Sequence, residues 1–205
     1  ETFGHGLGVA PDMWIIKRRD GTGSWAVGFN DANILGGTSK YLILQGTQAI
    51  LTFSNFWGSS PASSTVMRIA GDSTIGGSSQ TYVAYAFAQK QGYSKFGKYE
   101  GNGNSDGPFI YTGFKPAFVI VKNADGTTNW RMNGPDGVFL SVNESDAVYD
   151  SAPGPIDRVS NGFKIRGGDD LRASGGTFIY MAWAKNPFVT STGVPTTAGS
   201  TGPAT

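Results

Sequence analysis

Two pairs of carboxylates are the residues in this sequence that could most directly do chemistry. Asp169 and Asp170 stand in "GGDDLR", and Glu144 and Asp146 stand in "NESD". Paired acids can act as the acid and the nucleophile or base of a glycosidase. Short acidic segments beside glycine and serine are also typical of solvated turns, and we favour that interpretation. At the positions of Asp169 and Asp170, the related first half of the chain carries serine and threonine.

The other catalytic patterns are missing from the sequence. A single histidine, His5, lies in "FGHGLG" without a partner motif, so we interpret it as a turn residue. The chain has no GxGxxG or GxSxG motif and no DxDxDG calcium loop. It also has no cysteine, which excludes disulfides and thiolate metal sites. We therefore predict no catalytic residues, no metal site and no cofactor, and we expect that the protein is not an enzyme.

The best candidates for ligand binding surround a tryptophan. Trp57 lies in "SNFWGSSP", and an exposed tryptophan beside amides can stack on a sugar and bind its hydroxyl groups. A buried core position for Trp57 is equally compatible with the sequence. The predicted ligand-binding set is Trp57, Asn55, Asn33 and Asp31.

The elements that position these residues come in two copies. The segment "GLGVAPDMWIIKRRDGTGSW" (6–25) matches "YTGFKPAFVIVKNADGTTNW" (111–130) without a gap, and eight of the 20 positions are identical. Later, "TYVAYAFA" (81–88) matches "TFIYMAWA" (177–184). The offset is 105 in the first match and 96 in the second, so copy one has nine extra residues between Trp25 and Ser64. Surface loops absorb such differences, so we expect recognition to reside in residues 30–64.

Each copy is predicted to be an antiparallel β-sandwich, jelly-roll or lectin-like. "DMWIIKRR" and "AFVIVKN" are short apolar runs typical of central strands, and a "DGT" turn and a tryptophan follow each of them. Trp25 and Trp130 are interpreted as core residues. The late strands carry one bulky face and one mostly small, alanine-rich face; the bulky face should fill the core between sheets, and the small face permits close approach. "GDDLRAS" could form one helical turn.

The repeats define the predicted domains. Residues 1–92 form the first repeat, 93–189 the second, and 190–205 a linker or tail rich in threonine, glycine and proline. Copy two is preceded by the strand-like "KFGKYEG", which has no counterpart before copy one. We therefore interpret copy one as clipped at its N-terminal side and expect further copies upstream.

Composition excludes several classes of partner. Charged residues make up 15% of the chain and the formal net charge is +1, so nothing directs the protein to nucleic acid. No apolar run approaches the roughly 18 residues of a membrane span, and we expect no membrane insertion.

Several of these segments together resemble a known family. "GHGLGVAPDMWIIKRR", "GYSKFGKYEGNG" and "ASGGTFIYMAWAKNPF" are similar to a repeated domain of tailed bacteriophages, common in marine phages and found in tail-fibre and other virion surface proteins. The resemblance covers residues 4 to about 190. It implies a location on the virion surface, other virion proteins as partners, a homo-oligomer (a trimer is favoured) and a host-surface glycan as the ligand. It defines no catalytic or ligand residues.

Three functions follow as hypotheses. The leading one is a tail-fibre-like virion module that attaches to host-surface glycans. The alternative is a capsid or tail decoration protein with a purely structural role, and the third is a polysaccharide depolymerase. Adhesion requires exposed aromatic residues in loops, whereas a depolymerase requires acids gathered in one cleft.

Overall fold

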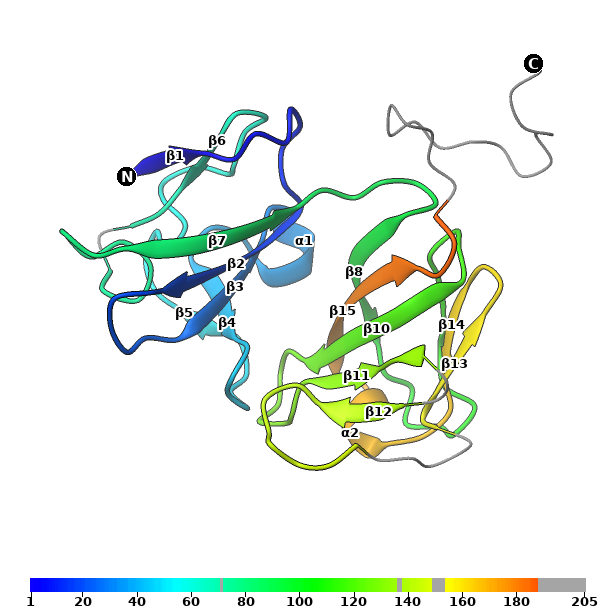
Figure 1. Cartoon of the computed structure of the whole chain (residues 1–205). Helices are drawn as coiled ribbons and strands as arrows, with labels where there is room; N and C mark the ends of the chain where they lie inside the picture. The colour runs from blue at the N-terminus through cyan, green and yellow to red at the C-terminus, as the bar shows by residue number, and fades with distance from the viewer. Residues whose placement is uncertain (71, 136–137, 149–153, 188–205) are drawn as a thin grey trace, which may run out of the picture.

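Strands dominate the computed structural model, which describes residues 1–70, 72–135, 138–148 and 154–187. The all-β prediction is confirmed, and the strands pair in antiparallel fashion (Figure 1). The predicted tail, 190–205, lies outside the described residues. Copy one contains β1 (Thr2–Gly4), β2 (Met13–Arg18), β3 (Trp25–Phe29), α1 (Ala32–Leu35), β4 (Lys40–Ile43), β5 (Leu51–Thr52), β6 (Val66–Arg68) and β7 (Tyr82–Phe87).

Copy two repeats most of these strands in the same order. Its elements are β8 (Ser94–Glu100), β9 (Phe109–Tyr111), β10 (Pro116–Asn123), β11 (Arg131–Asn133), β12 (Phe139–Ser141), β13 (Ile156–Val159), β14 (Gly162–Ile165), α2 (Asp169–Arg172) and β15 (Thr177–Ala184). The helical turn expected in "GDDLRAS" is therefore present as α2.

The strands form four sheets, two for each copy. Copy one has a five-stranded sheet in the order β5-β4-β3-β2-β7 and a small sheet, β1-β6. Copy two has a five-stranded sheet in the order β12-β11-β10-β15-β8 and a three-stranded sheet, β13-β14-β9. Four consecutive strands correspond, β4-β3-β2-β7 in the first large sheet and β12-β11-β10-β15 in the second. β8 extends the second sheet beyond β15, whereas β7 ends the first.

Two pairs of residues that are identical in the two copies have matching structural roles. Asp20 and Asp125 follow the central strands, and each carboxylate accepts a hydrogen bond from the backbone N–H at the start of the late strand, Thr81 at 2.9 Å and Thr177 at 2.7 Å. Gly8 has a φ of 72° and its counterpart Gly113 a φ of 83°, a conformation that favours glycine. The repeated motif thus fixes how each central strand is entered and left.

Three apolar clusters hold the layers together. One lies between the large and the three-stranded sheet of copy two, and it includes Val121, Phe163 and Phe178. A second lies between the large sheet of copy one and β1-β6, and it includes Ile16 and Met67. The third cluster is shared, because both copies contribute buried side chains to it. We call this third cluster the shared core.

The shared core lies between the two five-stranded sheets. Copy one contributes Met13, Val27, Phe29, Ile34, Leu35 and Leu42, and copy two contributes Phe96, Ala124, Trp130, Ile179 and Met181. The bulky face of β15 lines it through Ile179 and Met181, as predicted, whereas β7 contributes only the partly buried Phe87 from its bulky face. The two repeats therefore meet through these faces and not through the alanine-rich ones.

Trp130 ties the two repeats together within the shared core. Its side chain is fully buried, and its indole Nε1 donates a hydrogen bond of 2.8 Å to the backbone oxygen of Ile43 in copy one. Trp25, its counterpart, is only partly buried and stacks on Tyr85 with ring centroids 6.3 Å apart. The core interpretation is confirmed for Trp130, whereas Trp25 lies at the margin.

Most of the extra residues of copy one lie in the segment whose helix, α1, packs into the shared core. Leu44 and Val142 make the same hydrogen bond, to the backbone oxygens of Trp25 and Trp130, and they lie 98 positions apart, where the tryptophans lie 105 apart. Seven of the nine extra residues therefore lie between Trp25 and Leu44, a segment that contains α1. Ile34 and Leu35 of α1 are buried in the shared core. This part of the loop serves packing.

We predict that the two matched tryptophans differ in their contribution to stability. Trp130→Ala should lower the free energy of unfolding by about 3–5 kcal/mol, because it leaves a cavity in a closed core. Trp130→Phe, which removes the hydrogen bond to Ile43 but keeps most of the bulk, should cost about 1–3 kcal/mol. Trp25→Ala should cost clearly less than Trp130→Ala. Urea unfolding of the three variants checks this, and equal losses at positions 25 and 130 would show that the repeats do not depend on a shared core.

Candidate functional site

Trp57, the central residue of the predicted glycan site, is buried. Its side chain is 2% exposed, and its Nε1 donates a hydrogen bond of 2.8 Å to the backbone oxygen of Lys40. Its ring packs edge-to-face against Trp14 at 5.3 Å and against Phe56 at 4.8 Å. The prediction of an exposed stacking platform is therefore wrong, because the loop folds this tryptophan into the cluster beneath β1-β6.

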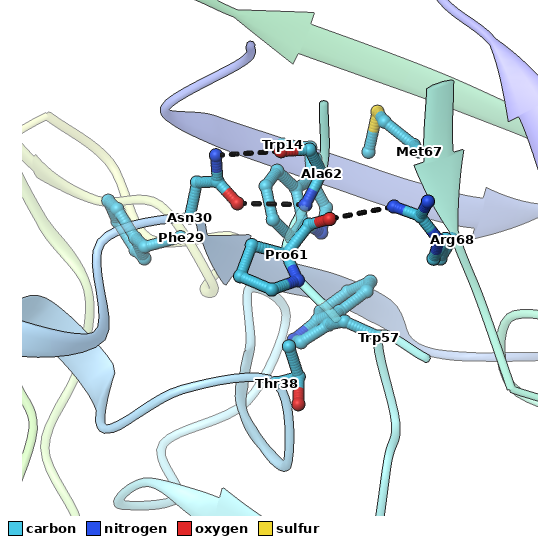
Figure 2. A pocket seen from close by; sticks show the side chains of 9 residues that line it. All are labelled: Trp14, Phe29, Asn30, Thr38, Trp57, Pro61, Ala62, Met67 and Arg68. Carbon is cyan, nitrogen blue, oxygen red and sulfur yellow. Dashed lines mark hydrogen bonds between the residues drawn. The ribbon is translucent and has the colours of Figure 1, made fainter. Parts of the chain in front are cut away.

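A glycine makes room for the two tryptophans. A Cβ atom at Gly28 would lie 2.5 Å from Nε1 of Trp14 and 2.6 Å from Cε2 of Trp57, so no other residue fits there. Figure 2 shows the loop held over the rings by two hydrogen bonds between Asn30 and Ala62 and by one from Arg68 to Pro61. The space that remains is about 10 Å³, too small for a sugar.

The other three predicted ligand residues are exposed but are used locally. Asp31 caps α1: its carboxylate accepts hydrogen bonds from the backbone and side-chain nitrogens of Asn33, both at 2.8 Å. Asn55 adopts a left-handed conformation with φ 53°, and its backbone N–H donates to the Ser39 hydroxyl. Of the four predicted ligand residues, only Asp31 and Asn33 are hydrogen-bonded to each other. Because Trp57 is buried, no aromatic ring among the four is available to stack on a sugar.

The remaining candidates for chemistry also have structural partners. His5 accepts a hydrogen bond from the Leu7 N–H at Nδ1, so the proton is on Nε2, which donates to the Ser63 oxygen at 3.0 Å. Asp170 forms an ion pair of 2.6 Å with Arg131 and thereby ties α2 to β11. Among the described residues, no group of three or more histidine or acidic side chains could hold a metal ion.

A surface that sequence reasoning missed lies on the three-stranded sheet of copy two. Phe109 and Tyr111 alternate with buried Ile110 on β9, and they are 47% and 65% exposed. Residues paired directly across antiparallel strands point to the same face. Lys164 is paired with Phe109 and Asp157 with Lys164, so two aromatic rings and two charged groups share the outer face. We call this surface the β9 face.

Glycine and charge shape the β9 face. Gly162 lies opposite Tyr111, and a Cβ atom there would come within 2.1 Å of the Ile110 backbone oxygen, so the close approach of β14 to β9 requires glycine. Asp106 pairs with Lys164 at 3.0 Å and with Arg166 at 2.9 Å. The hydrogen bond from Lys164 lowers the pKa of the Asp106 carboxyl. The face thus offers aromatic planes beside ionised hydrogen-bonding groups.

The alternation in "FIY" was the only sequence signal for this face. Copy one has Thr2 and Gly4 where copy two has Phe109 and Tyr111, as the strand registers show. The ungapped sequence match pairs Tyr111 with Gly6, so only the strand register shows this difference.

Comparison with known families places the whole described unit in one group. The model of a domain of unknown function, DUF7483, matches residues 1–187. The chain belongs to this family. The match spans both repeats, so a single DUF7483 domain includes the shared core. No curated protein and no solved structure matches the chain. In the described part of this DUF7483 domain, no helix has the length and apolar character needed to cross a membrane.

A buried lysine of this DUF7483 domain has a strongly lowered pKa. Lys122 of β10 is fully buried, and its ammonium donates to the backbone oxygens of Asn123 at 2.5 Å and Gly126 at 2.9 Å. Burial lowers the pKa of Lys122 from 10.5 to about 8. A perturbed lysine in a cleft would suggest catalysis. Here one acceptor belongs to the last residue of β10 and the other to the turn that follows, so Lys122 closes that turn.

We predict a pH dependence of stability from Lys122. Its pKa is lower in the folded than in the unfolded state, so the unfolded chain binds more protons between about pH 8 and 10.5, and stability rises with pH there. The free energy of unfolding of the wild type, relative to Lys122→Met, should increase by about 2 kcal/mol from pH 7 to pH 9.5. Urea unfolding of both proteins at the two pH values measures it. A difference that stays constant would mean that Lys122 is not buried as an ammonium.

Proposed function

We propose that this protein is a structural module of the surface of a tailed-phage virion, of tail-fibre type, and that it acts by holding and connecting rather than by catalysis. Two kinds of observation support the proposal. The phage-like sequence segments extend over nearly the whole chain, and the repeats of this chain are fused through one core. In this view the protein is located on the virion, assembles with other virion proteins and forms a homo-oligomer, with a trimer favoured.

The shared core carries this proposal. Two β-sandwiches joined only by a linker could move independently, whereas these two bury Trp130, Met181 and Leu42 in a common cluster. The extra helix of copy one, α1, also packs into that cluster through Ile34 and Leu35. A unit of this kind transmits force without bending at the junction, which suits an appendage or a decoration exposed to shear.

The test is the location of the protein on the particle. We expect antibodies raised against residues 1–187 to label purified virions at the tail or its fibres, seen by electron microscopy. Labelling spread over the capsid shell would instead support the decoration alternative. Absence of the protein from virions, or release of reducing sugars from host polysaccharide by the purified protein, would contradict the structural proposal.

The β9 face favours host-glycan attachment as a second candidate function. Exposed aromatic rings beside charged groups are the chemistry that binds sugar faces and hydroxyl groups. Phe109 and Tyr111 supply the rings, and Lys164, Asp106 and Asp157 supply the hydrogen-bonding groups. This surface replaces the buried Trp57 as the site for which an attachment role is proposed.

Replacing the two rings should therefore weaken glycan binding without unfolding the protein. Each stacked aromatic contributes about 1–3 kcal/mol, by analogy with base stacking, so Tyr111→Ser should weaken a single site about fivefold to 150-fold. Phe109→Ser should act in the same direction. Tyr93→Ser is the matched control, because Tyr93 is a similarly exposed aromatic, 44%, outside this face.

Binding to a glycan array and to host cells provides the measurement, with urea unfolding as the check on stability. Equal binding by the wild type and the Phe109→Ser/Tyr111→Ser variant would remove attachment from the β9 face. A loss that is matched by Tyr93→Ser would point to a general effect of surface aromatics instead.

A further inference from the structure

The strand β7 and its counterpart β15 differ in the number of strands that they pair with. Its counterpart β15 has a neighbour on each side, β10 and β8. In the described part of the chain, β7 pairs only with β2 and ends its sheet (Figure 1). An unpaired edge strand presents free backbone donors and acceptors, which are a template for another strand.

In copy two, β8 pairs with the edge of β15 and packs its side chains against the residues beside it. Tyr99 of β8 stacks on Phe178 at 5.1 Å, meets Phe163 edge-to-face at 6.4 Å, and donates a hydrogen bond of 2.8 Å from its hydroxyl to the Leu171 backbone oxygen. Phe96, on the opposite face of β8, is buried in the shared core. The strand thus adds one aromatic side chain to each of two clusters.

Copy one has hollows where copy two has Tyr99. At the offset of 96, the three residues that contact Tyr99 correspond to Tyr82, Met67 and Ile75. Tyr82 and Ile75 line a hollow of about 330 Å³ beside β7, together with Ile16, Ile69 and Phe3. Met67 lines a second hollow of about 450 Å³, which follows β7 from Ala84 to Phe87. Both volumes fall in the range of binding clefts, unlike the void beside Trp57.

The residues of β7 are exposed as expected for an incomplete sheet. Ala84 is exposed, and Tyr85 is 47% exposed, whereas its counterpart Met181 is buried at 1% with Phe96 of β8 paired opposite. The exposure is therefore confined to the positions that β8 covers in copy two.

We propose that β7 receives an extended strand of the β8 type, contributed by another repeat of this family, by β-strand addition. In the register of β15 and β8, the aromatic at the Tyr99 position pairs opposite Tyr82 and enters the hollow lined by Ile75. The aromatic at the Phe96 position pairs opposite Tyr85 and covers it. The backbone provides affinity and the two aromatic positions provide specificity. This proposal does not depend on the virion role.

One difference between β7 and β15, at Ala84 and its counterpart Tyr180, gives a test of register. Gly97 of β8 lies opposite Tyr180, where a Cβ atom would come within 2.8 Å of the tyrosine hydroxyl oxygen. The counterpart of Tyr180 is Ala84, which is small and lines both hollows. A strand bound at β7 can therefore carry a large side chain where β8 requires glycine.

The experiment adds the strand to the intact chain. A second copy of the sequence of residues 93–107 is placed directly before Glu1, which reproduces the spacing between β8 and β9 ahead of β1. We expect the added strand to slow amide hydrogen exchange in β7 by about tenfold or more, because the exposed edge becomes hydrogen-bonded. The midpoint of thermal unfolding should rise as well.

Two matched versions of the added strand test the side-chain pockets. Asp in place of the aromatic at the Tyr99 position of the added strand should abolish the protection of β7. Leu in place of its glycine at the Gly97 position should keep the protection, whereas Gly97→Leu in the native β8 should destabilise the protein.

The proposal fails if the unaltered added strand leaves exchange in β7 unchanged, or if the Asp version protects β7 equally. It also fails if Leu at the glycine position of the added strand abolishes protection, because the register would then be wrong. Sedimentation of the protein without the added strand completes the set. Dimers held by one β7 against another would show that the edge takes a second β7 instead of a β8-type strand.

Discussion

Burial of apolar side chains between the two five-stranded sheets is the interaction on which the rest of the structure depends. A sheet of this length has two faces, and neither repeat can cover both with its own small sheet. In each repeat β1-β6 or β13-β14-β9 covers the outer face, and the inner faces cover one another. Trp130 joins the halves further, because its indole finds its acceptor, the Ile43 oxygen, only in the other repeat. The folding unit is therefore the pair of repeats.

The two repeats share a fold but expose different surfaces. Copy one uses its extra length for α1 and for a loop that buries Trp57, while its late strand β7 keeps a free edge. Copy two keeps a shorter connection, completes its sheet with β8 and presents Phe109 and Tyr111 on β9. In copy two, the segment before the repeat supplies the strand β8. In copy one, the longer connection supplies the helix α1. Duplication thus provides one scaffold and two surfaces that can be specialised separately.

Two charged side chains, Lys122 and Asp125, hold the turn after β10 in place through hydrogen bonds to the backbone. Lys122 is buried near the end of β10, and its ammonium donates to the backbone oxygen of Asn123 in the strand and to that of Gly126 in the following turn. Asp125, in the same turn, binds the N–H that begins β15. A buried polar group must be hydrogen-bonded, so Lys122 holds the turn against the end of β10, and the exposed Asp125 holds the same turn against the start of β15. The residues at 17/122 and 20/125 match in the two copies: each lysine donates to the backbone oxygen of the next residue, and each aspartate accepts from the N–H at the start of the late strand.

The sequence by itself determined the strand content, the duplication and the helical turn at α2, because these depend on local periodicity and on matches within the chain. It predicted the same core role for Trp25 and Trp130, but only Trp130 is fully buried. It did not determine whether Trp57 faces solvent: the residues around Trp57 suit a surface loop, and only the packing of Trp14 over Gly28 provides the place that buries it. The β9 face was equally hidden, since Phe109, Lys164 and Asp157 are distant in sequence and meet only through strand register. Tertiary structure decided these points because exposure depends on which distant segments cover a side chain, and a single stretch of sequence does not contain that information.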